Sequence, residues 1–270
     1  MVSKKILTAI GIVVLIVLVL LAVFALPLIT ESSTAVLTIE QGSVQVAQSP
    51  LRTVTGDVAL KQGDTIKTGP DGKASVVLFG SSVVRLDSNT EINFAELQAQ
   101  KDARKVSIDQ KSGRVWSRVI KLSGVENYQV NTPRSVAAIR GTGFDSRINP
   151  DGTVDVSVVD GTVRVTRKTD SSFVDVGAEQ AVTVGDHVLT LHAIVRDDWI
   201  KESEQKDKEF LIKLREMLKS KYWAYVELAK AQYKLTDQQV DEFIDGALIG
   251  KYSQDQIKSG LDQIGIEIKP

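Results

Sequence analysis

The sequence predicts a mainly β domain between an N-terminal transmembrane helix and a C-terminal α-helical tail. Three observations carry this prediction: an uncharged aliphatic run at residues 6–30, short β-branched runs separated by turn residues up to about residue 195, and a charged stretch with helical periodicity from residue 196 onward. The predicted segments are a cytoplasmic N-terminus at residues 1–5, the membrane span at 6–30, the β domain at 31–195 and the helical tail at 196–270.

The membrane span is predicted from length and charge. About 20 apolar residues in a helix cross the hydrocarbon core of a bilayer, and residues 6–30 contain no charge. Lys4 and Lys5 precede the run and the next basic residue is Arg52, so the N-terminus is expected in the cytoplasm and the bulk of the chain outside it. The alternative is a cleaved signal peptide, since Val23 and Ala25 suit a cleavage site, but the run is longer than a usual signal segment.

Composition excludes several function classes. The chain has 33 Lys and Arg against 34 Asp and Glu and a net charge of -1, which argues against nucleic acid as a partner. It contains no cysteine, which removes disulfides, thiolate metal sites and a cysteine nucleophile. With only two histidines, the sequence predicts no cofactor and no metal site.

The β prediction for residues 31–195 depends on alternation and turns. Val154, Val156 and Val158 alternate with polar residues, so one face of this run is expected to be buried. Asp160-Gly161 is a two-residue hairpin signal that leads into a second alternating run. Turn residues recur every 8 to 12 positions or so, which is typical of either a small sandwich or a short solenoid-like stack.

The tail is predicted to begin with one long helix, from about residue 198 to 234. Asp197 or Asp198 is placed to cap its start, and Trp199 is expected to anchor its first turn to the β domain. The apolar stripe of this helix consists of Leu211, Leu214, Leu218, Tyr222, Tyr225 and Ala229.

Two shorter helices are expected to follow the long one. Thr236 with Gln239 and Ser253 with Gln256 both form the S/T-x-x-Q pattern of a capping box. The two units also resemble each other in sequence, which predicts a duplicated helical hairpin.

The residues that could support catalysis or metal binding do not form a known pattern. His187 and His192 fall on opposite faces of a regular strand, and Gly141-Thr142-Gly143 lacks the ending of a phosphate-binding loop. Asp151, Asp155 and Asp160 do not have the spacing of a calcium loop, and no serine has a recognisable His and Asp partner. The sequence therefore predicts a protein that is not an enzyme.

An aromatic cluster lies on the predicted long helix. It consists of Tyr222, Trp223 and Tyr225. Large aromatic rings bury much area at a low cost in entropy, so the cluster is expected either in the core or on a partner-binding surface.

Two segments of the predicted β domain carry an ordered set of motif residues. These are Thr68, Gly69, Asp71, Ala74, Gly80, Ser81, Leu86, Thr132, Pro133, Arg140, Gly141, Thr142, Phe144, Val158, Gly161 and Val163. Together they resemble the FecR-type domain family, which is named for the ferric-citrate regulator. The resemblance covers about residues 40–168. It implies an extracytoplasmic β domain that binds or transmits a signal and performs no reaction. Thr132, Pro133, Arg140, Gly141, Thr142, Phe144 and Gly161 are expected to have mainly structural roles.

In the signalling members of this family, a cytoplasmic helical segment before the span acts on a sigma factor. Only residues 1–5 precede the predicted span here. The expected function is therefore a membrane-anchored, non-catalytic binding or scaffolding module that meets an envelope protein or polymer. The alternative is a transmembrane signal-transduction protein of the ferric-citrate regulator type.

Overall fold

A computed structural model describes residues 35–250, except 48–50, 101–102, 121–124 and 140. The chain divides into two compact units, and the division falls between Gln205 and Lys206. We call the part up to Gln205 the β unit and the described part from Lys206 onward the helical unit. Among the described residues, no helix is both long and apolar enough to cross a membrane. The predicted span at residues 6–30 lies outside the described residues, as does the second capping box at Ser253.

The strands of the β unit form two sheets, which confirms the mainly β prediction. Sheet A consists, from one edge to the other, of β18 (Leu189–Ala193), β17 (Gln180–Val184), β14 (Val154–Asp160), β13 (Gly143–Ile148), β10 (Arg114–Arg118), β7 (Ser82–Leu86), β6 (Lys73–Leu78), β1 (Ala35–Gln41) and β4 (Val58–Leu60). Sheet B consists of β16 (Phe173–Gly177), β15 (Thr162–Arg167), β12 (Ser135–Ile139), β11 (Val125–Asn131), β9 (Ala103–Ser112), β8 (Glu91–Gln100), β5 (Thr65–Thr68), β2 (Val44–Ala47) and β3 (Leu51–Thr53).

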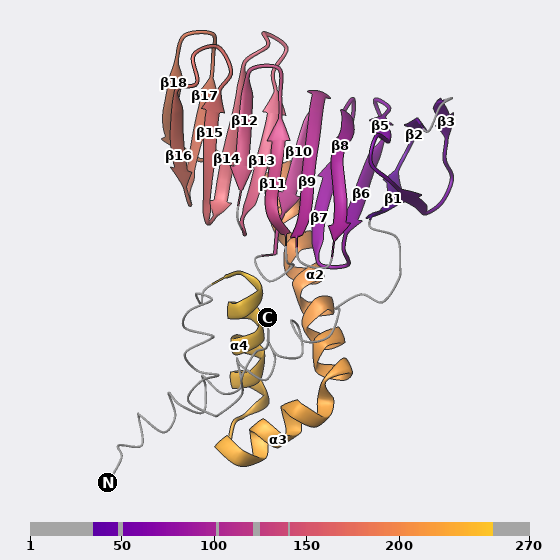
Figure 1. The fold of residues 1–270 in the computed structure, drawn as a ribbon, viewed down its shortest axis with the longest axis vertical. Coiled ribbons are helices and arrows are strands. Elements are labelled where there is room, and N and C mark those ends of the chain that lie inside the picture. The colour runs from indigo at the N-terminus through magenta and orange to yellow at the C-terminus, as the bar shows by residue number, and fades with distance from the viewer. Residues whose placement is uncertain (1–34, 48–50, 101–102, 121–124, 140, 251–270) are drawn as a thin grey trace. The chain divides into compact units, whose positions relative to one another are not determined.

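The two sheets lie face to face, and the chain fills them from one end to the other (Figure 1). It adds one or two strands to sheet A and then one or two to sheet B, so strand order follows sequence order except at β3 and β4. Pairing is antiparallel throughout the described ladders, apart from the parallel pair β9 and β11. The β unit is therefore sandwich-like, one of the two alternatives that the sequence left open.

The core between the sheets comes from alternate residues. Val154, Val156 and Val158 of β14 are fully buried, as their alternation predicted. Phe144 of β13 meets Tyr128 of β11 edge to face, with ring centroids 6.4 Å apart. These contacts join sheet A to sheet B through apolar packing.

The predicted hairpin at Asp160-Gly161 is wrong. Gly161 has the positive φ, +79°, of a tight reversal, but β14 pairs with β13 and β17 whereas β15 pairs with β12 and β16. The turn therefore carries the chain from sheet A to sheet B. A turn signal reports a local reversal of direction, and it does not report which sheet receives the next strand.

Helix α2 (Asp198–Lys221) begins at the predicted position, but the long helix is shorter than expected. It ends at Lys221, and Tyr222, with a φ of -117° and a ψ of 25°, separates it from α3 (Trp223–Tyr233). The amide of Tyr222 still donates a hydrogen bond to the carbonyl of Leu218, and the amide of Val226 donates one to the carbonyl of Tyr222. The spacing of three and four residues is thus kept across the break, which is why periodicity did not indicate it.

Helix α4 (Asp237–Leu248) begins at the predicted capping box. Within the helical unit, α2 and α4 are joined by ion pairs. Arg215 Nη1 lies 2.6 Å from a carboxylate oxygen of Asp245, and Lys219 Nζ lies 2.7 Å from one of Asp241. The apolar face of α4 is buried at Val240, Phe243, Ile244, Ala247 and Leu248.

Candidate functional site

The family motif residues in the turn between β11 and β12 have structural contacts. Thr132 Oγ1 accepts a hydrogen bond of 2.9 Å from the amide of Ser135, and the amide of Thr132 donates to the carbonyl of Ser135 at 2.9 Å. Pro133 is exposed between them. Lys168 Nζ donates to the carbonyl of Thr132 at 2.6 Å. This corner therefore sets where β12 enters sheet B.

The motif residues on either side of β13 and β14 meet at one corner of the β unit. Gly141 and Gly161 both have positive φ, at 72° and 79°. A Cβ on Gly161 would lie 2.4 Å from Cγ2 of buried Thr142 and 2.9 Å from the carbonyl oxygen of Gly141, so only glycine fits. Phe144 lies in the core, and Arg140 lies outside the described residues.

Gly143, unlike Gly141 and Gly161, is explained by a close contact with a side chain of the neighbouring strand. A Cβ on Gly143 would lie 2.2 Å from Nη2 of Arg118 in the adjacent strand β10, so the guanidinium occupies the space of the missing side chain. Arg118 Nη1 donates to Oδ2 of Asp160 at 2.5 Å, and the amide of Gly143 donates to Oδ1 of the same carboxylate at 3.1 Å. Asp160 thus holds β10 and β13 together where the chain leaves sheet A.

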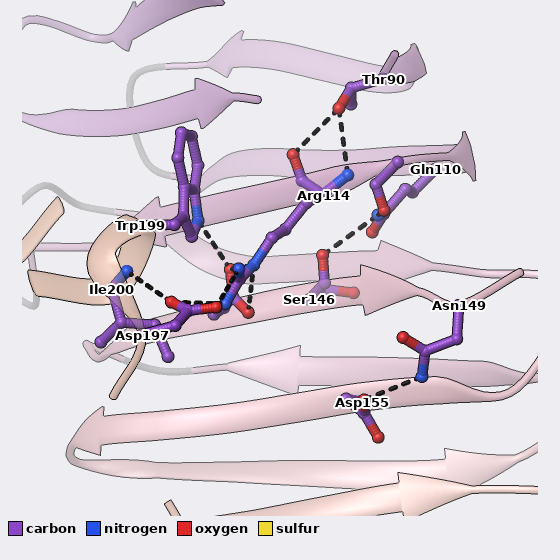
Figure 2. A network of polar contacts seen from close by, with 11 residues as sticks. Thr90, Gln110, Arg114, Ser146, Asn149, Asp155, Asp197, Trp199 and Ile200 are labelled. Atoms are coloured by element: carbon purple, nitrogen blue, oxygen red, sulfur yellow. Dashed lines mark hydrogen bonds and ion pairs between the residues drawn. The ribbon is translucent and has the colours of Figure 1, made fainter. Parts of the chain in front are cut away.

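A buried polar network fixes the first turn of helix α2 to the outer face of sheet A (Figure 2). Arg114 Nε lies 3.0 Å and 2.9 Å from the two carboxylate oxygens of Asp145, which lies on the adjacent strand. The two terminal nitrogens of Arg114 donate to Asp197 at 2.5 Å and 3.2 Å. Trp199 Nε1 donates to Asp145 Oδ1 at 2.9 Å, and the amide of Ile200 donates to Asp197 Oδ1 at 3.0 Å. Asp197 therefore caps α2, as predicted.

Apolar packing surrounds the same contacts. Trp199 and Ile200 pack with Trp116, which lies directly opposite Asp145 on β10. Lys73 Nζ lies 5.5 Å from the centre of the Trp199 ring and 3.0 Å from Glu202, also on α2. The predicted anchoring of the first turn of the helix by Trp199 is thus observed. The sequence did not indicate Arg114 or Asp145, because they are distant from the helix along the chain.

Burial controls the charges of this network. It raises the pKa of the fully buried Asp145 carboxyl to about 6, although Arg114 and Trp199 act in the opposite direction. For Asp197 burial also acts upward, but Arg114 and the amide of Ile200 hold its pKa below the ordinary value. Burial works against the charge of Arg114, yet Asp145 and Asp197 keep its pKa above the ordinary value. The guanidinium of Arg114 stays charged. Of the three ionisable groups in this network, Asp145 has the pKa nearest to neutral pH.

The two described members of the predicted aromatic cluster differ in exposure. Tyr222 is buried, whereas Trp223 is 66% exposed. The side chain of Tyr225 lies outside the described part of the chain. Of the two described rings, only Trp223 can meet a partner.

The acidic and histidine residues weighed above lie in separate places. Asp151 accepts the amide of Thr153 within a turn at 2.9 Å, whereas Asp155 accepts the hydroxyl of Thr183 at 2.6 Å. His192 lies 3.2 Å from the same hydroxyl, and His187 lies in the turn before β18. Within the described residues, no group of three or more acidic or histidine side chains is arranged to hold a metal ion.

Comparison with protein families identifies the central part of the β unit. Residues 64–164 match the family described as FecR protein. The match confirms the resemblance to the FecR-type domain family; it begins just before β5 and ends within β15. It includes Arg114 and Asp145, and it ends before Asp197 and Trp199. No curated protein matches the sequence.

Two solved structures also match the chain. Both are crystal structures, at 1.65 Å and 2.50 Å resolution, of a protein from Parabacteroides distasonis ATCC 8503 that is provisionally described as an anti-sigma factor. Each match has 21% sequence identity and a TM-score of 0.40, and covers 49% of this chain. The chain spans 60% of the length of the matched chains.

Proposed function

We propose that this protein is a FecR-type regulatory protein, in which the β unit binds a signal outside the cytoplasm and helix α2 transmits it. The observation that carries the proposal is the position of the helix attachment. Arg114 and Asp145, which hold the start of α2, lie inside the segment that matches the FecR family. A shift between β10 and β13 would therefore act directly on the first turn of the helix.

The membrane part of the proposal depends on the sequence. The uncharged residues 6–30 anchor the protein, and the basic residues before them keep its N-terminus in the cytoplasm. Protease added to cells with a permeabilised outer layer is expected to digest the β unit while the inner membrane is intact. Protection of the β unit under these conditions would contradict the topology.

In this proposal the protein performs no reaction itself, and its output is a change in the activity of a partner. The test is a transcript profile of the source organism with the gene deleted. We expect a defined set of transcripts to change, to be restored by the wild-type chain, and not to be restored by Trp199→Ala, which loosens α2 from sheet A. A conservative Trp199→Phe chain, produced at the same level, is the matched control and should restore part of the response.

A second candidate is a binding or scaffolding module without signalling. It is favoured by a hydrogen-bonded polar ladder on sheet B. Asn131 Nδ2 donates to Ser107 Oγ at 2.9 Å and to Asp109 Oδ1 at 3.0 Å, and Gln129 Nε2 donates to Ser107 Oγ at 3.0 Å. Such a pre-organised row of amide, hydroxyl and carboxylate groups suits a polar envelope ligand. An envelope defect with an unchanged transcript profile would favour this candidate over regulation.

A further inference from the structure

Exposed apolar side chains of the described β unit gather at one end. Phe173 is 58% exposed, Val188 57%, Leu191 45% and Val195 75%, and all four lie in or beside the last strands of the two sheets. A concentration of this kind usually marks an interaction surface.

At this end of the sandwich, each sheet finishes in an edge strand with no further described strand beside it. β18 is the last strand of sheet A and β16 the last of sheet B, and Figure 1 shows them together at one end of the sandwich. Within the described residues, the chain does not cover this edge after β18. The amide of Ile194 bonds the carbonyl of Glu179, and by Asp197 the chain has returned to Arg114 on the outer face of sheet A.

The core is also uncovered at this end. Leu189 pairs in register with Val184, and Leu191 with Val182. Both valines are fully buried, so the two leucines lie on the face of β18 that points between the sheets. Leu191 is nevertheless 45% exposed, because no described strand follows β18. Stacked β architectures need a cap at such an end.

The two ends of the sandwich differ in how they are protected. At the other end, the edge strands β3 and β4 have 3 residues each, and short edges resist pairing with another chain. β18 has 5 residues, Leu-Thr-Leu-His-Ala, without a Lys, Asp, Glu or Pro. It lacks the charges and proline that usually prevent edge-to-edge pairing.

The sequence of β18 is complementary to itself. In an antiparallel pair centred on Leu191, that residue lies opposite Leu191 of the second copy, Leu189 lies opposite Ala193, and Thr190 lies opposite His192. Apolar residues then meet on the inner face and polar residues on the outer face, with no like charges opposed. In a two-fold symmetric pair, a residue that contacts a second position is itself contacted by that position of the other copy, and this register meets that condition.

We propose that two copies of this protein associate through β18, which pairs with β18 of the second copy in antiparallel register about Leu191. The pairing continues sheet A from one copy into the other and covers the half-buried Leu189 and the exposed Leu191. It concerns the edge of the sandwich alone and does not depend on the proposed regulatory function.

Site-directed cross-linking tests the register, because the chain has no cysteine of its own. The full chain is solubilised in detergent and treated with a short bis-maleimide. Leu191→Cys should cross-link to itself, and a mixture of Thr190→Cys and His192→Cys chains should cross-link more than either chain alone. Ala138→Cys, at an exposed position on β12, is the control and should stay uncross-linked.

A second measurement tests the association without a cross-linker. Light scattering, corrected for bound detergent, should give the mass of two chains for the wild type and of one chain for Leu191→Lys, which opposes two positive charges at the centre of the pair. Circular dichroism should show the same fold for both, and Ala138→Lys should remain a dimer. A wild-type chain with the mass of one copy at micromolar concentration, or equal cross-linking of Ala138→Cys and Leu191→Cys, overturns the proposal.

Discussion

Trp199 Nε1 donates a hydrogen bond of 2.9 Å to Asp145 Oδ1, which joins the first turn of helix α2 to a central strand of sheet A. The two residues are 54 positions apart in the sequence, and both are buried. The same ring packs against Trp116, so one side chain supplies both the apolar contact and a hydrogen bond to a buried carboxylate. The attachment of the helix is therefore sensitive to the size of this side chain and to the charge of its acceptor.

The first prediction concerns the size of that ring. Trp199→Ala should lower the free energy of unfolding of the β unit by about 3–5 kcal/mol, because a large buried side chain is replaced by a cavity. Urea denaturation followed by circular dichroism of the β-sheet signal measures the loss. An unchanged midpoint would show that Trp199 does not anchor the helix.

Trp199→Phe separates packing from hydrogen bonding. It keeps an aromatic ring against Trp116 but removes the donor to Asp145. Arg114 Nε still donates to the same oxygen, so we expect a smaller loss of about 1.5–3 kcal/mol, the usual contribution of one hydrogen bond to a charged group.

The second prediction is a pH dependence of stability. The pKa of Asp145 is raised from 3.8 to about 6, so the folded state binds this proton more tightly than the unfolded state does. The resulting stabilisation is present at low pH and is lost as the pH rises through the folded pKa. A shift of this size corresponds to at most about 3 kcal/mol. Urea denaturation from about pH 3.5 to about pH 7, a range that includes both pKa values, measures it.

Asp145→Asn is the matched variant for this experiment, because asparagine is similar in shape and does not titrate. The other ionisable groups are common to both proteins, so their contributions largely cancel in the difference. The wild type should lose more stability than the variant as the pH rises across this window. Identical pH profiles would mean that Asp145 has the same pKa in the folded and unfolded states.

The third prediction concerns Gly143 and the guanidinium that occupies its side-chain space. Gly143→Ala places a methyl group 2.2 Å from the present position of Arg118 Nη2, and Arg118 is held by Asp160. We expect a loss of about 1–3 kcal/mol from overpacking, measured by urea denaturation.

Two controls test the cause of that loss. Gly56→Ala introduces the same methyl group where no atom lies within 4 Å, and it should leave stability nearly unchanged. In a double-mutant cycle, Arg118→Ala should remove most of the cost of Gly143→Ala. Additive effects in the cycle would contradict a clash between these two residues.

Local sequence patterns predicted two features of the fold: which residues of a strand are buried, and where a helix begins. The valines of β14 are buried because a strand places alternate residues on one face, and that rule needs no knowledge of the neighbouring strands. The Asp160-Gly161 turn was assigned wrongly because its partner strands are chosen by distant parts of the chain. After the turn, β15 could have joined either sheet. Its pairing with β12 and β16 places it in sheet B.

The polar network at the start of α2 shows the same limit. Arg114 is 31 positions from Asp145 and 83 from Asp197, and no spacing rule connects such residues. The sequence did indicate the helix side of the contact, because a capping aspartate followed by a large ring is a local pattern. The acceptor for that ring could be found only once β10 and β13 were paired.

The last prediction concerns the helical unit. Thr236 Oγ1 accepts the amide of Gln239 at 3.2 Å, and the side chain of Gln239 accepts the amide of Thr236 at 2.9 Å. Thr236→Ala removes the first bond and should destabilise α4 by about 0.5–2 kcal/mol, while Thr236→Ser keeps the hydroxyl and should cost little.

Hydrogen exchange of the amides in α4 measures the change locally. Because α4 is also held to α2 by Arg215 and Lys219, faster exchange should be largest in the first turn of α4 and smaller near Asp245. Uniformly faster exchange along α4 would mean that the cap supports the whole helix.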